Sequence, residues 1–218
     1  MVDVSRETPS TPDLARRAFS PDGLPLAERY VALLATAGVE RGLIGPREAP
    51  RLWERHILNS LAVSSLVPPE ATLADLGSGA GLPGIVLAIG RPDLRITLVE
   101  PLQRRVTFLE EVIDDLSLED VSVVRGRAEE LHGRERYAVV TARALAPLSR
   151  LLTWSMPLVA SDGVLLAMKG SSAGEEVLAA GAELRRLRCS PPELLTVTGP
   201  DGSSTATVVR VAHANPRG

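Results

Sequence analysis

The sequence predicts an α/β fold in which helices cover a parallel sheet, with a C-terminal antiparallel hairpin and an N-terminal helical extension. The first observation is that short apolar runs alternate with longer runs of helical periodicity from residue 72 onward. Such alternation is typical of a parallel sheet with helices on both faces. The second is a pair of extended runs, residues 193–198 and 205–212, which flank the turn sequence Gly-Pro-Asp-Gly. These runs indicate a hairpin at the edge of the sheet.

The chain divides at Pro68 and Pro69 into two predicted parts. Residues 1–67 form a disordered tail and a helical extension, and residues 68–218 form the α/β domain. The tail begins MVDVSRETPSTPD, which is polar and lacks the charged-then-apolar pattern of a signal peptide.

The extension is predicted to contain two helices. Residues 26–37 are apolar at helical spacing, and Gly38 and Gly42 then interrupt the pattern. Pro50 starts a second helix that continues to Ser65, because proline is tolerated in the first turn of a helix.

The second part is predicted to alternate strand and helix without internal repeats. Its parallel strands are residues 72–76, 94–99, 121–124, 138–141 and 163–168. Its helices are residues 83–89, 104–115, 148–158 and 175–187. Ligands of open α/β sheets bind beyond the carboxyl ends of the strands, so the residues that follow each strand are candidate site residues.

Composition limits the class of protein. The 218 residues are 44% hydrophobic and 3% aromatic, enough for an independent core. No apolar run approaches the ~20 residues that cross a bilayer, so no membrane role is expected. The single cysteine, Cys189, cannot form an internal disulfide, which favours a reducing cytoplasm. The net charge of −3 argues against a broadly basic surface, so any contact with nucleic acid must be local.

A glycine-rich stretch, LADLGSGAGLPGI at residues 73–85, organises the chain. Apolar residues that end a buried strand lead through Asp75 to Gly77, Gly79 and Gly81. Glycine is needed where the backbone takes a positive φ or where a ligand touches the chain directly. The stretch therefore predicts a loop that holds a ligand against bare backbone.

The spacing of this loop narrows the ligand. A dinucleotide fingerprint has the form G-x-G-x-x-G, whereas this loop reads G-x-G-x-G and continues with Leu82. Asp75 would also place negative charge beside a pyrophosphate. S-adenosylmethionine carries a sulfonium and an ammonium and no phosphate, so it is the leading cofactor hypothesis.

Several motifs together resemble a known family. They occur in order between about Trp53 and Gly170, and they read WERHILNSL, DLGSGAGLPGI, LVEPLQRRVTFLE, AEE, ARALAPL and LLAMKG. This combination resembles the 16S ribosomal RNA guanine-N7 methyltransferases, also called glucose-inhibited division protein B. The glycine loop alone would indicate only a class I S-adenosylmethionine-dependent methyltransferase. The resemblance implies that class of Rossmann-like fold, and 16S ribosomal RNA of the small subunit as partner.

The expected cofactor site lies at the ends of the first four strands. Glu100 ends the second strand, where a carboxylate can accept both hydrogens of a ribose diol; the alternative is a solvated turn residue. By resemblance, Ala128 and Glu129 contact adenine and Arg143 lies at the cofactor. The full expected set is Asp75, Gly77, Gly79, Gly81, Leu82, Glu100, Ala128, Glu129 and Arg143.

The residues after the fourth strand bear on the atom that is methylated. Enzymes that methylate exocyclic amines carry an Asn/Asp-Pro-Pro-aromatic run there, but this chain has Thr141-Ala142-Arg143. Cytosine C5 chemistry needs a thiol near this site, and Cys189 comes too late in the chain. Guanine N7 already has a lone pair, so its methylation needs positioning and no general base.

Arg143 and Lys169 are the expected catalytic residues. Arg143 interrupts a small, apolar run and has the donors to reach guanine O6 or a phosphate. Lys169 is the only lysine among 24 basic residues, it follows the fifth strand, and it is also expected to bind RNA. The alternatives are one arginine among many and a lysine retained by chance.

Further RNA contacts are expected from His56, Arg104 and Arg105. For His56 the alternative is a position on an amphipathic packing helix, and the two arginines are expected to divide between packing and phosphate contact. His132 and His213 look incidental, and no cluster has the spacing of metal ligands.

Three other functions stay open. A small-molecule methyltransferase would share the fold, a nicotinamide dehydrogenase would need a different loop spacing, and a non-catalytic RNA-binding assembly factor would keep the fold without turnover. The expected protein is a cytoplasmic monomer.

Overall fold

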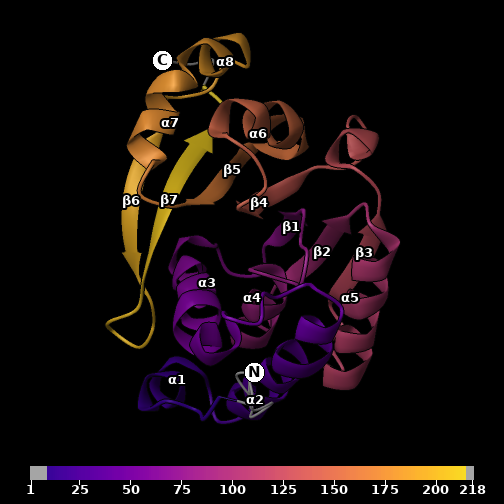
Figure 1. Ribbon diagram of the computed structural model, residues 1–218. Coiled ribbons are helices and arrows are strands. Elements are labelled where there is room, and N and C mark those ends of the chain that lie inside the picture. The colour runs from indigo at the N-terminus through magenta and orange to yellow at the C-terminus, as the bar shows by residue number, and fades with distance from the viewer. Residues whose placement is uncertain (1–8, 215–218) are drawn as a thin grey trace.

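A seven-stranded sheet in the order β3-β2-β1-β4-β5-β7-β6 forms the centre of the protein (Figure 1). The computed structural model describes residues 9–214, so residues 1–8 of the predicted disordered tail lie outside the described part. The strands are β1 (Thr72–Leu76), β2 (Arg95–Glu100), β3 (Val121–Arg125), β4 (Tyr137–Arg143), β5 (Val159–Lys169), β6 (Glu193–Thr198) and β7 (Thr205–Ala212).

The first five strands are parallel, and the chain reverses direction across the sheet between β1 and β4. β2 and β3 lie on one side of β1, whereas β4 and β5 lie on the other. This is the switch point at which open α/β sheets bind ligands, because the loops after β1 and β4 leave in opposite directions. The predicted hairpin is confirmed: β7 pairs antiparallel with β5, and β6 pairs antiparallel with β7.

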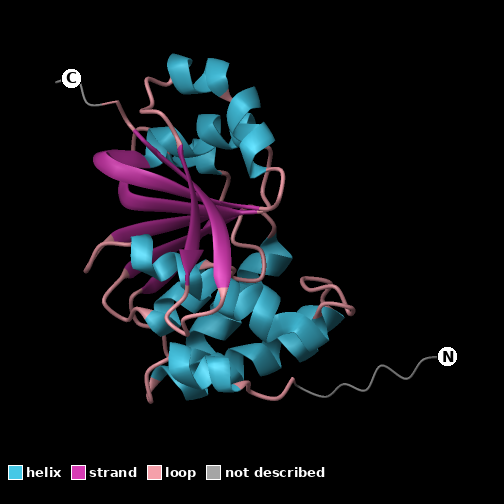
Figure 2. Ribbon diagram, turned by 90° about the vertical axis from the view of Figure 1, so that its left-hand side faces the viewer, coloured by secondary structure: helices cyan, strands magenta, loops and turns pink. Residues whose placement is uncertain are grey.

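Helices cover both faces of the sheet, which gives three layers (Figure 2). One face carries α6, α7 and α8, and the other carries the N-terminal helices with α4 and α5. The helices are α1 (Asp13–Ala18), α2 (Gly23–Leu33), α3 (Asn59–Leu61), α4 (Gly84–Gly90), α5 (Gln103–Leu116), α6 (Leu148–Ser155), α7 (Ala173–Ala179) and α8 (Gly181–Arg186).

The N-terminal extension packs directly on the sheet layer. Leu34 and Ile57 from the extension belong to the same buried cluster as Ile85 and Leu98 of the α/β part. The buried Tyr30 hydroxyl of α2 donates a hydrogen bond to the Ala80 carbonyl oxygen at 2.6 Å. The extension therefore touches the glycine-rich loop itself, and the division at residue 67 stays a prediction.

The observed helices differ from the predicted ones in several details. The extension has an additional helix, α1, and the first predicted helix ends in wider π-type turns in η1 (Leu34–Gly38). The expected helix 175–187 is two helices, because the backbone at Ala180 leaves helical geometry with φ −83° and ψ 0° before α8. The second helix of the extension contains wider π-type turns in η3 (Leu52–Leu58), which the apolar pattern does not reveal. Among the described residues, no helix has the length and apolarity to cross a membrane.

Candidate active site

The glycine-rich loop after β1 is shaped by positive φ angles. Gly77, Gly79 and Gly81 have φ values of 65°, 62° and 98°, which residues with a Cβ rarely adopt. The Gly77 amide donates to the Val99 carbonyl oxygen at 2.8 Å, which fixes the loop against β2. A Cβ on Gly81 would lie 2.9 Å from the Tyr30 hydroxyl, so glycine at this position leaves room for Tyr30 of the extension to pack against the loop.

Asp75 supports the loop from inside. Its side chain is fully buried and accepts hydrogen bonds from the Gly84 amide and the Thr141 hydroxyl, both at 3.1 Å. Burial raises the pKa of the Asp75 carboxyl to about 7, although these hydrogen bonds and the charge of Arg143 oppose the rise. Asp75 thus ties β1 to the start of α4 and to β4.

A cavity of about 290 Å³ lies where β1 and β2 end. Glu100 is fully buried at its edge, and its two carboxylate oxygens accept the Gly79 and Leu102 amides, each at 3.0 Å. Arg105 approaches the same carboxylate at 3.4 Å, and its buried Nε has no partner among the described residues. The cavity is lined by Leu76, Gly77, Val99, Glu100, Pro101, Leu102, Arg105, Gly126, Arg127, Ala128, Glu129, Leu145 and Trp154.

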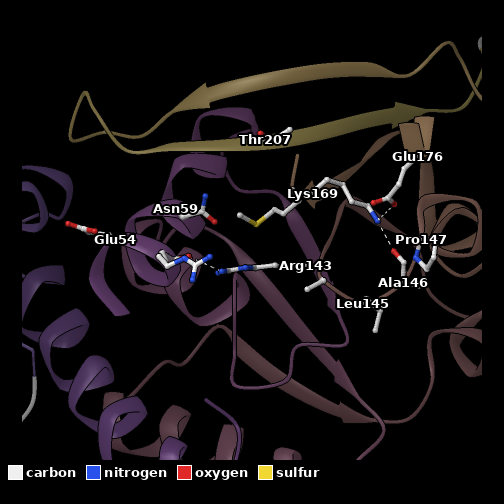
Figure 3. A pocket seen from close by; sticks show the side chains of 13 residues that line it. Glu54, Asn59, Arg143, Leu145, Ala146, Pro147, Lys169, Glu176 and Thr207 are labelled. Atoms are coloured by element: carbon white, nitrogen blue, oxygen red, sulfur yellow. Dashed lines mark hydrogen bonds and ion pairs between the residues drawn. The ribbon is translucent and has the colours of Figure 1, made fainter. Parts of the chain in front are cut away.

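A larger cavity of about 720 Å³ opens beside it, where β4 and β5 end against the extension (Figure 3). Its lining combines three basic residues with two carboxylates, an amide and small apolar groups. The lining residues are Glu54, Arg55, Asn59, Arg143, Ala144, Leu145, Ala146, Pro147, Met168, Lys169, Gly170, Glu176 and Thr207.

Arg143 points from the end of β4 toward the extension. One terminal nitrogen donates to the Arg55 carbonyl oxygen at 2.8 Å and meets His56 Nδ1 at 3.0 Å. The other donates to the Ser60 hydroxyl at 3.1 Å. Burial lowers the pKa of the Arg143 guanidinium. The guanidinium is therefore fixed by main-chain and side-chain acceptors at the wall of the larger cavity.

Lys169 lies at the opposite side of that cavity, at the end of β5. Its ammonium, whose side chain is 6% exposed, donates to the Ala146 carbonyl oxygen at 2.6 Å and to Glu176 at 2.7 Å (Figure 3). Glu176 also accepts the Leu148 amide at 2.8 Å. Burial would raise the pKa of the Glu176 carboxyl, but Lys169 and the Leu148 amide lower it below its ordinary value.

The segment between β4 and α6, residues 144–147, separates the two cavities. Leu145 lines both of them. A Cβ on Gly77 would overlap the Leu145 side chain, so glycine lets this leucine cover the loop. Ala144 takes a left-handed φ of 50° to turn the segment. A ligand in the smaller cavity and a ligand in the larger one would thus meet at a single side chain.

The structure brings most of the predicted site residues together. Gly77, Glu100, Ala128 and Glu129 line the smaller cavity with Arg105, and Arg143 and Lys169 line the larger one. The predicted residues that line neither cavity are Asp75, Gly79, Gly81, Leu82, Arg104 and His56. Among these, Gly79 acts through its amide on Glu100, and His56 stands behind Arg143.

Sequence reasoning did not single out Leu145, Trp154 or Glu176 as site residues. Leu145 and Trp154 are apolar residues of ordinary pattern, so nothing distinguished them from core positions. Glu176 lies on α7, and no local pattern indicates that it pairs with Lys169 at the end of β5. The one sequence signal that could have identified Glu176 is its position seven residues after the only lysine, within reach of an ion pair.

Comparison with known proteins places this chain in a family. Residues 24–199 match the family described as rRNA small subunit methyltransferase G. A Nocardioides protein named ribosomal RNA small subunit methyltransferase G is 64% identical over 214 residues, which are 98% of this chain and 86% of the relative. A Streptomyces coelicolor protein of the same name is 54% identical, with coverage of 96% of this chain and 88% of the relative.

Solved structures show the fold independently. A TehB-like SAM-dependent methyltransferase from Corynebacterium glutamicum superposes with a TM-score of 0.58 at 14% identity, covering 81% of this chain and 98% of that chain. A SAM-dependent O-methyltransferase from Thermotoga maritima also gives 0.58 at 14% identity, covering 78% of this chain and 71% of that chain. The fold is that of the class I methyltransferases, and by its sequence the chain belongs to the rRNA small subunit methyltransferase G family.

Proposed function

We propose that the protein transfers a methyl group from S-adenosylmethionine to N7 of one guanine in 16S ribosomal RNA of the small subunit. The observation that carries the proposal is the pair of cavities that meet at Leu145. A methyl donor in one and a base in the other would face each other across a short distance. We further propose that it acts in the cytoplasm as a monomer.

The smaller cavity fits S-adenosylmethionine. Glu100 has carboxylate lone pairs to spare for a ribose diol after accepting two amides. The buried Arg105 Nε has no acceptor among the described residues, and a bound ligand could supply one. When bound, the cofactor supplies a methyl group on a positively charged sulfur. Asp75 acts indirectly, since it is buried beneath the loop.

The larger cavity fits a nucleotide of RNA. Its basic residues and its volume of about 720 Å³ suit a base with its phosphate. No proton leaves N7 during methylation, so the cavity needs no general base. Positive charge moves from sulfur to the base, and a cation directly at N7 would oppose that movement.

We therefore assign Arg143 and Lys169 to holding the guanine O6 and phosphate oxygens. Lys169 has three donors and uses two on Ala146 and Glu176, which leaves one for the substrate. Arg104 is exposed, so we assign it to contact with RNA phosphate. Arg105 lines the smaller cavity, so we assign it to the cofactor. His56 contacts Arg143 and is proposed to act on RNA binding only indirectly, through that arginine.

The test is a methylation assay on ribosomal RNA from a strain that lacks the enzyme. Label from S-adenosylmethionine should enter 16S RNA at one position, mapped by strand cleavage at the modified base. Absence of labelling at saturating cofactor would reject the proposal and leave the assembly factor or the small-molecule enzyme. Calorimetry with reduced nicotinamide dinucleotide in place of S-adenosylmethionine tests the dehydrogenase alternative.

A further inference from the structure

A chain of three side chains runs from the extension to the end of β4. Glu48 Oε2 lies 3.0 Å from His56 Nε2, and His56 Nδ1 lies 3.0 Å from a terminal nitrogen of Arg143. The His56 side chain is 15% exposed and the Glu48 side chain is 32% exposed. The apolar residues Leu52, Trp53, Ile57 and Leu58 form the buried face of η3, the helix that carries His56, whereas His56 and Glu48 contribute polar contacts.

The chemistry of the partners fixes the form of the imidazole. A guanidinium has only donors, so His56 Nδ1 must present its lone pair to Arg143. The proton then sits on Nε2, where it is donated to the Glu48 carboxylate. A doubly protonated ring would direct an N–H at the guanidinium and break the contact.

We propose that His56 and Glu48 are positioning residues for Arg143: the neutral imidazole, oriented by Glu48, holds the guanidinium at the wall of the substrate cavity. The proposal rests on the proposed function, since it gives Arg143 a defined orientation toward the target base. It also gives the extension a task in the active site, because both positioning residues lie before residue 67.

The surrounding charges support the neutral imidazole. Burial lowers the pKa of His56, and the positive charges of Arg143 and Arg55 lower it further, against the contact with Glu48. Hydrogen bonding to His56 in turn lowers the pKa of Glu48, and Arg55 and Arg51 contribute in the same direction. Burial lowers the pKa of Arg143, and electrostatic interactions with Tyr30 and Asp75 oppose that change. The arrangement therefore favours an ionised Glu48 beside a neutral His56 near neutral pH.

Two substitutions of His56 separate its two contacts. Asparagine places an amide oxygen near the position of Nδ1, so His56→Asn keeps an acceptor for Arg143 and loses Glu48. Glutamine is one methylene longer and reaches the position of Nε2, so His56→Gln keeps the contact with Glu48 and loses Arg143. The two variants have the same polar group and nearly the same size, which makes each the control for the other.

The test measures kcat and both KM values on 16S RNA across pH. His56→Gln should lower kcat about tenfold because it loses the contact with Arg143, whereas His56→Asn should lose less, about threefold, because it loses only the orienting contact with Glu48. The KM for S-adenosylmethionine should not change in either variant. The wild-type rate should fall in acid as His56 gains its second proton, at a pH below the ordinary imidazole pKa because burial lowers the pKa of His56, and that acid limb should be absent from His56→Asn. Equal loss in both variants, or an unchanged acid limb, would overturn the proposal.

A spectroscopic readout works without activity. The chain has three histidines, so comparison of nitrogen spectra of wild type and His56→Asn identifies the His56 ring. The wild-type ring should show the Nε2–H tautomer at pH 8, and Glu48→Gln should weaken that preference. An Nδ1–H tautomer would refute the proposal even if methylation is confirmed. Conversely, the Nε2–H tautomer with no RNA methylation would reject only the proposed function. Thermal melting of each variant checks that the fold is retained.

Discussion

Lys169 and Glu176 form an ion pair with 2.7 Å between Nζ and Oε2, and together they hold the segment that divides the two cavities. Lys169 donates to the Ala146 carbonyl oxygen and Glu176 accepts the Leu148 amide, so the pair holds the C-terminal end of this segment and the start of α6. An arginine would have to place its wider, planar fork where one ammonium now reaches both acceptors. This geometry explains why the chain has a lysine and not an arginine at position 169.

Replacing Lys169 with alanine should weaken RNA methylation more than cofactor binding. The substrate loses one cationic donor, and the dividing segment loses its anchor at Ala146. We expect kcat/KM for 16S RNA to fall by at least about tenfold, with a cofactor Kd within about threefold of wild type. Methylation kinetics and calorimetry measure the two quantities.

The control for this variant is Arg186→Ala. Arg186 pairs with Glu183 at 2.7 Å on the exposed face of α8, which resembles the Lys169 pair in chemistry but lies outside both cavities. It should change neither quantity, because exposed ion pairs contribute little. Equal losses of methylation and cofactor affinity in Lys169→Ala would contradict the role assigned to Lys169.

Replacing Gly79 with valine should abolish measurable cofactor binding while the protein stays folded. A Cβ there meets only the Gly77 carbonyl oxygen, at 3.7 Å, so the cost to packing is small. The positive φ of 62° costs roughly 1–2 kcal/mol, and the side chain would project from the loop proposed to hold the cofactor. Calorimetry with S-adenosylmethionine tests this expectation.

Gly202→Val separates backbone strain from ligand contact. Gly202 has a similar φ of 77° with open space around it, in the loop between β6 and β7. The melting temperature should fall by a similar amount in both variants, but the affinity for the cofactor should fall only in Gly79→Val. Normal binding by Gly79→Val would show that the loop is merely a turn.

The sequence predicted the sheet and the ends of its strands well, because these depend on local patterns. The bounds of β1, β6 and β7 agree with the expected runs, and Arg143 and Lys169 were expected at one cleft and are found lining the same cavity. Alternating apolar runs and glycine spacing are readable within a window of about ten residues.

The contacts made by those side chains were not readable in the same way. Arg143 and His56 are 87 residues apart in the chain, and no local pattern reveals that they touch. Asp75 was expected at the ligand, yet its partners Gly84 and Thr141 enclose it, because the helix and the neighbouring strand close over it. Whether a strand-end carboxylate faces a ligand or the interior depends on packing that only the folded chain provides.

Replacing Glu100 with glutamine should weaken S-adenosylmethionine binding about tenfold or more. The amide has one acceptor oxygen, so it cannot accept the Gly79 and Leu102 amides and also a ribose hydroxyl. Glu110→Gln, on the exposed face of α5, is the control and should bind normally. Removing the 2′-hydroxyl from S-adenosylhomocysteine should weaken its binding to wild type, but it should weaken binding to Glu100→Gln much less, because that variant has already lost the contact. If the missing hydroxyl weakens binding equally in both proteins, Glu100 does not bind the ribose.

Asp75 should give the protein a stability that falls as pH rises. Its pKa is about 7 in the folded state and 3.8 in the unfolded reference, so between these values the folded protein holds a proton that the unfolded chain has released. The free energy of unfolding then decreases with pH, by up to about 1.4 kcal/mol per pH unit, and levels off above pH 7. Below about pH 4 both states are protonated and the dependence ends.

Asp75→Asn isolates this contribution. The amide oxygen can accept the Gly84 amide, and the amide nitrogen can donate to the Thr141 hydroxyl, so the variant keeps both contacts without a titrating group. Urea unfolding at pH 5, 6, 7 and 8 should show wild type losing stability relative to Asp75→Asn up to pH 7 and running parallel above it. A constant difference across this range would mean that Asp75 is ionised throughout. In that case the loop would require the negative charge of Asp75, and the hydrogen bonds to Gly84 and Thr141 alone would not be sufficient.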